Sequence, residues 1–451
     1  MGTNALTKIY LQDLAGGSMT LVSGPEGQPG VLADESAALP TISGDGRWIA
    51  FQSAATNLIP GYVKGNAVSE TDVYLYEVAT GDLTLVSHST SGALTGGSGN
   101  SDSPSLSHDG RYLVWSSTST DLVAGFADGN GLSAYDVYVF DRVAGTTRLV
   151  TRSPASATTS LNGGAGDASI SPDGRYVVVA TNASDAVSYT DNNGASPDLF
   201  LTPIATGDYQ LISHVPGAPT VGGNGQSGTV FGSRPASWLA GKVAFRSTAT
   251  DLVSGFSDQN ATGADTYVWD RGSGTTKLVS HANLSATRGG NGTTSGTVGV
   301  SADGSVVVHD NTSVTLTPGA VGGFGAVYAY DVATGDNSLA SHALSSLNLG
   351  PDNASSSGVA SADGRFIAYL SLASNLVSPF ADNNTTPAAD AFIVDRTGSP
   401  APASQTPPVV TGTVALGQML ACEPGKWSEF PALTFSWHRG NTQVATGQTY
   451  V

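Results

Sequence analysis

The stretch Ser107–Ser117, SHDGRYLVWSS, decides the fold, because close variants of it return along the chain at a nearly constant spacing. Each copy has the pattern S-x-D-G followed by an apolar run, although the fourth copy, SWLAGKVAF, lacks the Asp. The six copies begin at Ser43, Ser107, Ser171, Ser237, Ser301 and Ser361. Successive copies start about 60 to 66 residues apart. A fixed period of this size predicts an array of supersecondary units that bury their apolar faces against one another.

Four β-strands are expected in each unit, and the copy that starts at Ser107 shows them most clearly. The Asp-Gly pair between 102–107 and 111–117 is typical of a hairpin turn that joins two strands. A polar loop, DGNGLSAYD, leads to the alternating segment VYVFD at 137–141, and a further turn leads to TRLV at 147–150. Four antiparallel strands per unit, repeated without helical periodicity, predict an all-β fold, a β-propeller, whose ring leaves few exposed sheet edges.

The number of blades has two interpretations. Seven copies of the third strand, beginning with KIYLQD at 8–13, favour seven blades, of which the first lacks its two inner strands. Six copies of the S-x-D-G hairpin support the alternative of six blades, in which 8–13 is redundant. No fourth strand follows Asp395, and the N-terminal segment MTLVS at 19–23 is able to complete the final blade.

The composition limits the partners of the chain. It has 451 residues, of which 39% are hydrophobic and only 12% charged, and its formal net charge is -18. Nucleic acids and anionic lipids select clustered cationic side chains, so both are excluded as partners, and cations or neutral polymers are favoured. No segment approaches the roughly 20 consecutive apolar residues that cross a bilayer, so membrane insertion is not expected.

The repeats resemble those of a known class of bacterial propeller. The phrase SPDGRYVVVATNASD at 171–185, with an aromatic-rich third strand ending in Asp and then a strand like LVS, is similar to TolB-like repeats, also called WD40-like or PD40 repeats. The resemblance covers 1–397 and implies the propeller architecture. The class includes periplasmic scaffolds, sensors, peptidase gating domains and lyases, so the fold alone does not select a function.

The sequence changes character after 397. Residues 398–408, GSPAPASQTPP, have the composition of a linker. Residues 409–451 resemble bacterial immunoglobulin-like modules through Gly417, Leu420, Cys422, Pro424, Gly425, Trp427, Phe435, Trp437 and Arg439. The resemblance implies a disulfide partner for Cys422, which is the single cysteine of the chain. A complete sandwich needs roughly 100 residues, so we expect this module to be truncated.

The cellular location is predicted from the two ends of the chain. The N-terminus carries no basic and apolar secretory signal, but 2–14 aligns with 127–142 inside a repeat. We therefore expect that a leader has been lost upstream. Because the C-terminal module resembles those of secreted and surface proteins, the protein is expected in the periplasm or outside the cell, at a bacterial surface.

The loop between the second and third strands carries the most suggestive polar pattern. Four copies have an Asp, an Asn two residues later and another Asp just before the third strand. These residues are Asp128, Asn130 and Asp136; Asp191, Asn193 and Asp198; Asp258, Asn260 and Asp265; and Asp382, Asn384 and Asp390. Oxygen ligands at this spacing suit Ca²⁺, which accepts about six to eight oxygens. The alternative is that they only form local turns. The copy with Lys64, Asn66 and Asp72 is not expected to bind, and the copy near Asn311 lacks the pattern.

No catalytic residues are predicted. One repeat position after the fourth strand is occupied by His88, His214, His281 and His342, and by Arg152 in another copy. Residues that recur around a ring are expected to pack blades together. The aspartates of the S-x-D-G turns are expected to be turn formers; they are Asp45, Asp109, Asp173, Asp303 and Asp363. The sequence has neither a G-x-S-x-G nucleophile elbow nor a Walker-type phosphate loop.

The geometry of a four-stranded blade predicts where function lies. The loop between strands two and three and the connector to the next blade emerge at the same edge, and long segments gathered at one edge mark a binding surface. We expect an exported, monomeric, non-enzymatic binding or scaffold propeller with a protein or carbohydrate partner and Ca²⁺ as candidate stabilising ion. The alternative is a polysaccharide lyase or glycoside hydrolase, with unlike carboxylates and aromatic residues converging in one pocket.

Overall fold

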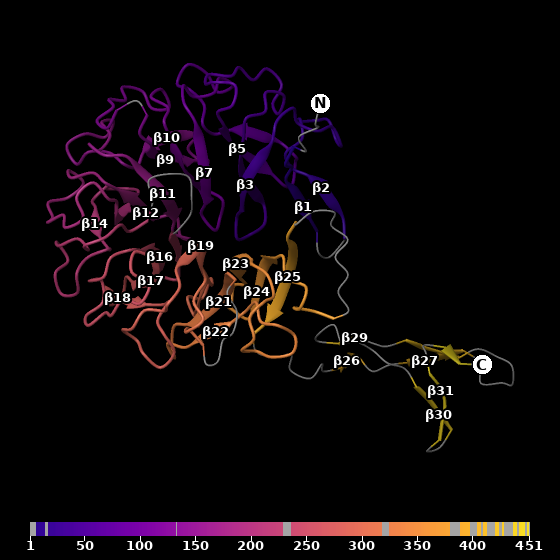
Figure 1. The fold of residues 1–451 in the computed structure, drawn as a ribbon. Coiled ribbons are helices and arrows are strands. Elements are labelled where there is room, and N and C mark those ends of the chain that lie inside the picture. Colours follow the sequence, from indigo (N-terminus) through magenta and orange to yellow (C-terminus); the bar gives the residue numbers. More distant parts are fainter. Residues whose placement is uncertain are drawn as a thin grey trace, which may run out of the picture. The chain divides into compact units, whose positions relative to one another are not determined.

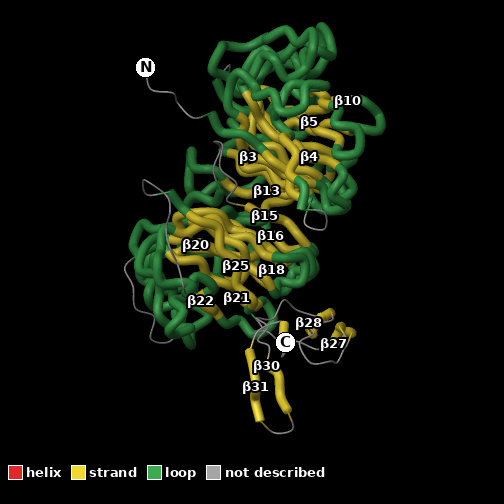
Figure 2. The backbone as a smooth tube through the Cα atoms, turned by 90° about the vertical axis from the view of Figure 1, so that its right-hand side faces the viewer, coloured by secondary structure: helices red, strands yellow, loops and turns green. Residues whose placement is uncertain are grey.

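A computed structural model describes the chain over 6–13, 17–131, 133–228, 236–317, 324–378 and 388–396, and over seven short strands between 404 and 450. The contacts divide the chain into two compact units, Met1–Val394 and Asp395–Val451. Every regular element of the described residues is a β-strand (Figure 2). No helix long and apolar enough to cross a membrane occurs in this part of the chain.

Six antiparallel sheets, the blades, follow one another along the first unit (Figure 1). The first two blades contain β3 (Ala37–Ile42), β4 (Trp48–Ser53), β5 (Asp72–Glu77) and β6 (Leu83–Leu85), and β7 (Ser101–Leu106), β8 (Tyr112–Ser117), β9 (Asp136–Asp141) and β10 (Thr146–Leu149). The next two contain β11 (Ala165–Ile170), β12 (Tyr176–Thr181), β13 (Asp198–Pro203) and β14 (Gln210–Leu211), and β15 (Ala236–Leu239), β16 (Lys242–Ser247), β17 (Asp265–Asp270) and β18 (Thr275–Leu278). The last two contain β19 (Thr294–Val300), β20 (Val306–Asn311), β21 (Ala326–Asp331) and β22 (Asn337–Leu339), and β23 (Ser355–Ala360), β24 (Phe366–Ser371) and β25 (Asp390–Asp395).

The blades are arranged as in a β-propeller. Within each blade the strands pair in chain order. The first strands of successive blades contact one another, from β3 through β7, β11, β15 and β19 to β23. Fourth strands such as β14, β18 and β22 lie at the periphery in Figure 1. The predicted fold class is confirmed, and the structure contains six blades, the alternative count, rather than seven.

The segment that suggested a seventh blade forms a separate hairpin. Strand β1 (Tyr10–Gln12) pairs with β2 (Met19–Leu21) in a two-stranded sheet. Ile9 and Val22 beside these strands pack in one apolar cluster with Phe51 of the first blade. The hairpin therefore covers the face of the first blade that no preceding blade covers. Because β2 pairs with β1, it does not complete the final blade as the sequence had suggested.

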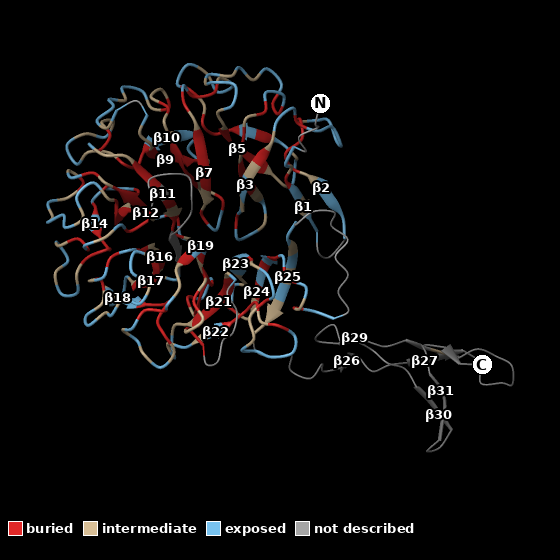
Figure 3. Ribbon diagram, viewed as in Figure 1, coloured by how far each residue is buried: buried red, intermediate tan, exposed pale blue. Residues whose placement is uncertain are grey.

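The apolar core lies in the seams between neighbouring blades, where Figure 3 shows the buried strands. In the seam between the first two blades, Leu75 belongs to one cluster with Trp115 and Tyr138. The rings of Trp115 and Tyr138 stack with their centroids 5.8 Å apart, and both side chains are fully buried. Equivalent clusters join each later pair of blades. A blade on its own would leave these faces in water, so each blade is stabilised by the next.

The S-x-D-G turn is a closed set of short-range hydrogen bonds. Ser107 Oγ donates to Asp109 Oδ1 at 2.7 Å, and the same carboxylate oxygen accepts the Arg111 N–H at 3.0 Å. Ser107 Oγ also accepts the Tyr112 N–H at 3.0 Å, which fixes the start of the second strand. Gly110 adopts φ 63°, a conformation that favours glycine. The prediction that these aspartates are turn formers is confirmed at this turn, and the other four make the same contacts.

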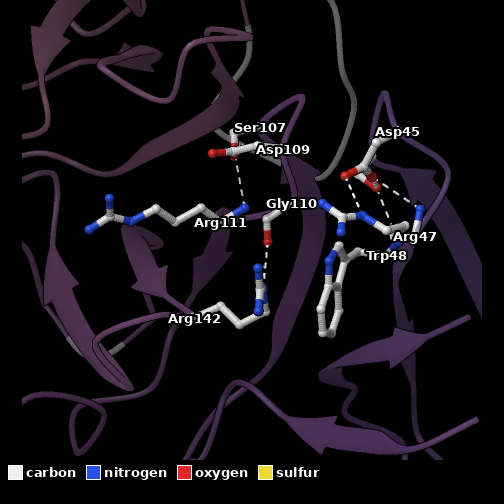
Figure 4. A network of polar contacts seen from close by, with 9 residues as sticks. Asp45, Arg47, Trp48, Ser107, Asp109, Gly110, Arg111 and Arg142 are labelled. Atoms are coloured by element: carbon white, nitrogen blue, oxygen red, sulfur yellow. Dashed lines mark hydrogen bonds and ion pairs between the residues drawn. The ribbon is translucent and has the colours of Figure 1, made fainter. Parts of the chain in front are cut away.

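The glycine of this turn also makes the contact between blades (Figure 4). A Cβ atom on Gly110 would lie 2.4 Å from Cδ1 and 3.0 Å from Cβ of Trp48, which belongs to the first blade. The Arg142 guanidinium lies over the Trp48 ring, 3.9 Å from its centroid, and its Nε donates to Gly110 O at 3.0 Å. The indole is thus held between a cation and a backbone surface. The third and sixth blades repeat the close approach at Gly174 and Gly364.

The described residues of the second unit form seven short strands. They are β26 (Ser404–Thr406), β27 (Val409–Gly412), β28 (Leu420–Glu423), β29 (Lys426–Trp427), β30 (Ser436–Arg439), β31 (Thr442–Thr446) and β32 (Thr449–Tyr450). β26 pairs with β29, β28 pairs with β27 and β32, and β30 pairs with β31. β26 lies inside the segment predicted to be a linker. The immunoglobulin-like module and the boundaries 397, 408 and 409 stay predictions.

The contact between blades at Gly110 generates a testable expectation. Gly110→Ala adds a methyl group against Trp48, so it is expected to lower the free energy of unfolding by about 2 to 4 kcal/mol. Gly145→Ala is the matched control, because Gly145 has nearly the same φ, 64°, and nothing within 4 Å of an added Cβ. Urea unfolding of both variants measures the difference. Equal losses would show that Gly110 has no role beyond its turn conformation.

Candidate functional site

The second-to-third-strand loops and the connectors between blades lie side by side along one edge of the propeller. Isolated parallel bridges join the two segments in the first four blades. They pair Val63 with Thr95, Ala127 with Thr159, Thr190 with Val221, and Ser257 with Arg288. The expectation that both long segments share one edge is confirmed in these blades. We call these paired segments, 54–71 with 87–100 and their repeats, the loop edge.

In the second blade the structure brings the three predicted ligands together. Asp128 Oδ1 accepts the N–H groups of Asn130 at 3.0 Å and Gly131 at 2.8 Å, which is an Asx turn. The turn directs Asn130 Nδ2 to Asp136 Oδ1 at 3.1 Å and to Gly163 O at 3.2 Å. Asn130 therefore bridges the loop, the third strand and the connector. The turn-forming role considered in the sequence is real, and it positions the amide.

The third and fourth blades repeat this arrangement. Asp191 Oδ1 accepts the Asn193 N–H at 2.9 Å, and Asn193 Nδ2 donates to Asp198 Oδ1 at 3.3 Å. Asp258 Oδ1 accepts the Asn260 N–H at 2.8 Å, and Asn260 Nδ2 donates to a connector carbonyl at 2.9 Å. In the sixth blade Asp382 and Asn384 lie outside the described residues, and Asp390 begins β25.

The aspartates that begin the third strands, Asp136, Asp198 and Asp265, are 0 to 3% exposed, and we call them the head aspartates. Each accepts a hydrogen bond from the hydroxyl group of the residue that lies two positions after the end of the fourth strand. The donors are Thr151 at 3.1 Å, Ser213 at 2.8 Å and Ser280 at 2.6 Å. Burial raises the pKa of each head aspartate to about 7, although the hydroxyl opposes this. The negative charge of the loop aspartate, such as Asp128, raises the pKa further.

Several oxygen atoms beside the head aspartates lack a partner. Oδ1 of Asn130, Asn193 and Asn260 is buried without a hydrogen bond, and so is Oδ2 of Asp198. Buried polar oxygens are normally satisfied, so each of these atoms is a candidate acceptor for a hydrogen bond or a ligand for an ion. A hard cation takes carboxylate, amide and backbone oxygens together. No three His, Cys, Asp or Glu side chains gather into a metal group within the described ranges, so a cation here would need the amide and carbonyl oxygens.

The first and fifth blades show what replaces the loop aspartate. In the first blade Lys64 occupies its position, and Lys64 Nζ donates to Glu70 O at 2.8 Å. Burial raises the pKa of Asp72, the head aspartate of this blade, while Lys64 acts in the opposite direction. Asn66 Oδ1 is unpartnered here too. In the fifth blade the head residue is Ala326, and the preceding loop sequence has no Asp or Asn. The fifth blade therefore lacks all three polar residues, whereas the first blade keeps the Asn and the head aspartate and has a lysine in place of the loop aspartate.

The repeated histidines share one local contact, and His281 packs two blades together as expected. Nδ1 of His88, His214, His281 and His342 lies 2.9 to 3.1 Å from the carbonyl oxygen of the following residue. His281 also crosses to the fifth blade, where its Nε2 lies 2.8 Å from Gly335 O. Its ring meets Tyr330 edge to face at 5.8 Å. These contacts occupy the ring nitrogen atoms of His281, so it serves the seam.

A pocket at the seam between the second and third blades was not anticipated. Its volume is about 1030 Å³, and Arg148, Arg152, Asp185 and Asp208 are among its lining residues. Arg152 takes the repeat position that is His in four other copies. Its guanidinium lies against Gly207, where an added Cβ would be 2.5 Å from Nη2. The His-to-Arg exchange was visible in the sequence, but only the fold shows that it opens onto a pocket.

Comparisons with known proteins give similarities of fold. No protein-family model and no curated protein matches the sequence. TolB from Acinetobacter baumannii is similar with a TM-score of 0.38 and 14% identity, over 73% of this chain and 58% of TolB. A structure from a study of two prolyl endopeptidases is similar with a TM-score of 0.45 and 10% identity, over 92% of this chain and 51% of the other chain. An oligogalacturonate lyase in complex with manganese is similar with a TM-score of 0.43 and 14% identity, over 81% of this chain and 77% of the lyase. This chain thus spans less than two thirds of the first two proteins, and TolB is the class that the repeats resemble.

The raised pKa of the head aspartates predicts an unusual pH dependence of stability. The folded-state pKa of about 7 lies above the unfolded value near 4, so the folded protein binds more protons between these pH values. The metal-free protein should therefore lose stability as the pH rises from about 4 to about 7. Asp198→Asn should remove part of this loss and raise the free energy of unfolding near pH 8 by roughly 2 to 4 kcal/mol.

Denaturation of the chelator-treated protein at a series of pH values measures this effect. Asp208→Asn is the control, because it removes one carboxylate from the exposed surface of the same blade. A metal-free Asp198→Asn protein with the wild-type pH profile would contradict the assigned pKa of Asp198.

Proposed function

We propose that this protein is a non-enzymatic binding or scaffold propeller that presents its loop edge to a partner outside the cytoplasm. The observation that carries the proposal is the equivalence of the polar residues at that edge. In the second, third and fourth blades the loop aspartate accepts the Asn backbone N–H, and in the second and third blades the Asn side chain donates to the head aspartate. An active site needs unlike groups that converge on one reacting atom. Sets that repeat blade after blade hold loops in position instead.

The pocket at the second seam is compatible with this proposal. Asp185, which lines it, accepts the backbone N–H of Asn162 at 3.0 Å. Asp121 and Asp251 make the same contact with connectors in the second and fourth blades. Asp185 therefore belongs to a repeated set of aspartates that hold the connectors in place. The export of the protein is supported by the resemblance of its repeats to TolB-like repeats.

We further propose that Ca²⁺ completes the loops of the second, third and fourth blades. The unpartnered Asn Oδ1 atoms, the buried head aspartates and the loop aspartates supply the oxygens that such an ion takes. The first blade supplies a counter-argument to a purely structural role, because there a lysine replaces the loop aspartate. If the other blades bind a cation from solution, a blade that lacks the loop aspartate is expected to supply a positive charge of its own, and Lys64 does so.

The test exchanges the two kinds of blade. Lys64→Asp should add one Ca²⁺ site to the protein, and Asp128→Lys should remove one, as counted by isothermal titration calorimetry. Thermal unfolding in excess Ca²⁺ against chelator should show stabilisation of about 2.7 kcal/mol for each site that is saturated at 100 times its Kd. Both substitutions copy residues that other blades already carry, so the variants are expected to fold. No shift of the melting temperature at millimolar Ca²⁺ would overturn the calcium proposal.

The binding role is tested separately. The purified protein should retain a cell-wall polysaccharide or a secreted protein in a pull-down, and substitutions at the loop edge, such as Arg288→Ala in the fourth connector, should alter retention of a partner bound there. Recovery of nothing, together with turnover of a polysaccharide or peptide substrate, would show an enzyme instead.

A further inference from the structure

The pocket at the second seam differs from its equivalents around the propeller. The matching pocket between the fourth and fifth blades has a volume of about 440 Å³ and contains Lys277 and His281 at the two repeat positions of Arg148 and Arg152. The pocket between the N-terminal hairpin and the first blade is smaller still, about 200 Å³. The second seam therefore combines two arginines with a larger space than either of these two pockets. A volume near 1030 Å³ is at the upper end of small-ligand sites.

The arginines of this pocket have hydrogen-bonding capacity to spare. Arg152 Nη1 makes one long bond, 3.4 Å, to Leu149 O, although a guanidinium carries five N–H donors. Ion pairs among the described residues involve other basic side chains, such as Arg47, Arg111, Arg175 and Lys242. Arg148 and Arg152 thus face the pocket without a carboxylate partner. In a chain of net charge -18, two such arginines favour an acidic group as ligand.

The remaining lining residues narrow the class of ligand. Asp185 and Asp208 line the same pocket, and Ser153 and Ser188 contribute hydroxyl groups. Carboxylates repel a polyanion of high charge density, but they accept hydrogen bonds from sugar hydroxyls. A ligand that binds both the arginines and the aspartates of the pocket carries isolated carboxylates among many hydroxyl groups. Uronic acid sugars have this chemistry.

We propose that the seam pocket between the second and third blades binds an acidic oligosaccharide, with Arg152 and Arg148 holding its uronate carboxylates. The inference rests on the proposed binding function and names its ligand class. Arg152 is fixed in place by Gly207, whose missing side chain lets the guanidinium lie against the backbone. The third blade's Tyr209 hydroxyl donates to the carbonyl groups of Val150 and Arg152 at 2.9 and 3.0 Å, so the arginine backbone is also held.

Two substitutions test the site with residues that this chain already uses. Arg152→His installs the residue of the other four copies, and Arg148→Gln installs the residue that the third blade has at 210. Calorimetric titration with galacturonate oligomers should show saturable binding to the wild-type protein that weakens with added salt. Each variant should bind at least about tenfold more weakly, since each removes charge-assisted hydrogen bonds. Neutral galactose oligomers should bind poorly to all three proteins.

The outcomes separate this inference from the proposed function. Equal binding by wild type and Arg152→His, with unchanged melting temperatures, would overturn the pocket assignment. No uronate binding, with capture of another polysaccharide or a protein, would overturn the inference and leave the binding function intact. Galacturonate that binds and is cleaved, with Arg152-dependent affinity, would support the pocket and overturn the non-enzymatic function.

Discussion

The contact between one blade and the next is the constraint on which this structure depends. Each sheet is apolar on both faces, and the clusters of buried residues belong to seams, such as the one that joins Leu75 to Trp115. Because a blade cannot satisfy its own faces, the spacing of the repeats must be kept along the chain. The N-terminal hairpin follows the same requirement, since Ile9 and Val22 cover the free face of the first blade. In the second, third, fifth and sixth blades the glycine of the S-x-D-G turn is part of this contact as well as of the turn.

Stacking in register also explains why the polar features repeat. Each of the first four seams brings a loop and a connector to the same edge, where a parallel bridge joins them. A head aspartate such as Asp198 is buried there with an unpartnered oxygen. Differences between copies then become informative, because the surrounding backbone is nearly the same in each. Lys64 in the first blade and Arg152 in the second seam are two such differences, and both involve a positive charge.

Much of the fold could be predicted from the sequence, because the S-x-D-G hairpin and the alternating third strand are local patterns with one structural solution. The blade count was less accessible. Residues 8–13 have the third-strand pattern, and only packing shows that they form β1 of a hairpin cap. The loop triads were found from their spacing, but the bridging role of Asn130 depends on a connector carbonyl 33 residues away. The seam pocket depends on contacts between Arg152 and Gly207, which no local pattern reveals.

Native-state hydrogen exchange tests the central claim of mutual stabilisation between blades most directly. The measurement follows amides of β8 in the second blade and β17 in the fourth blade while denaturant is raised. If the seams hold the propeller together, the slowest amides of both strands should open with the same free energy and the same denaturant dependence. Two different free energies, approached independently at high denaturant, would show blades that fold as separate units and would contradict this account.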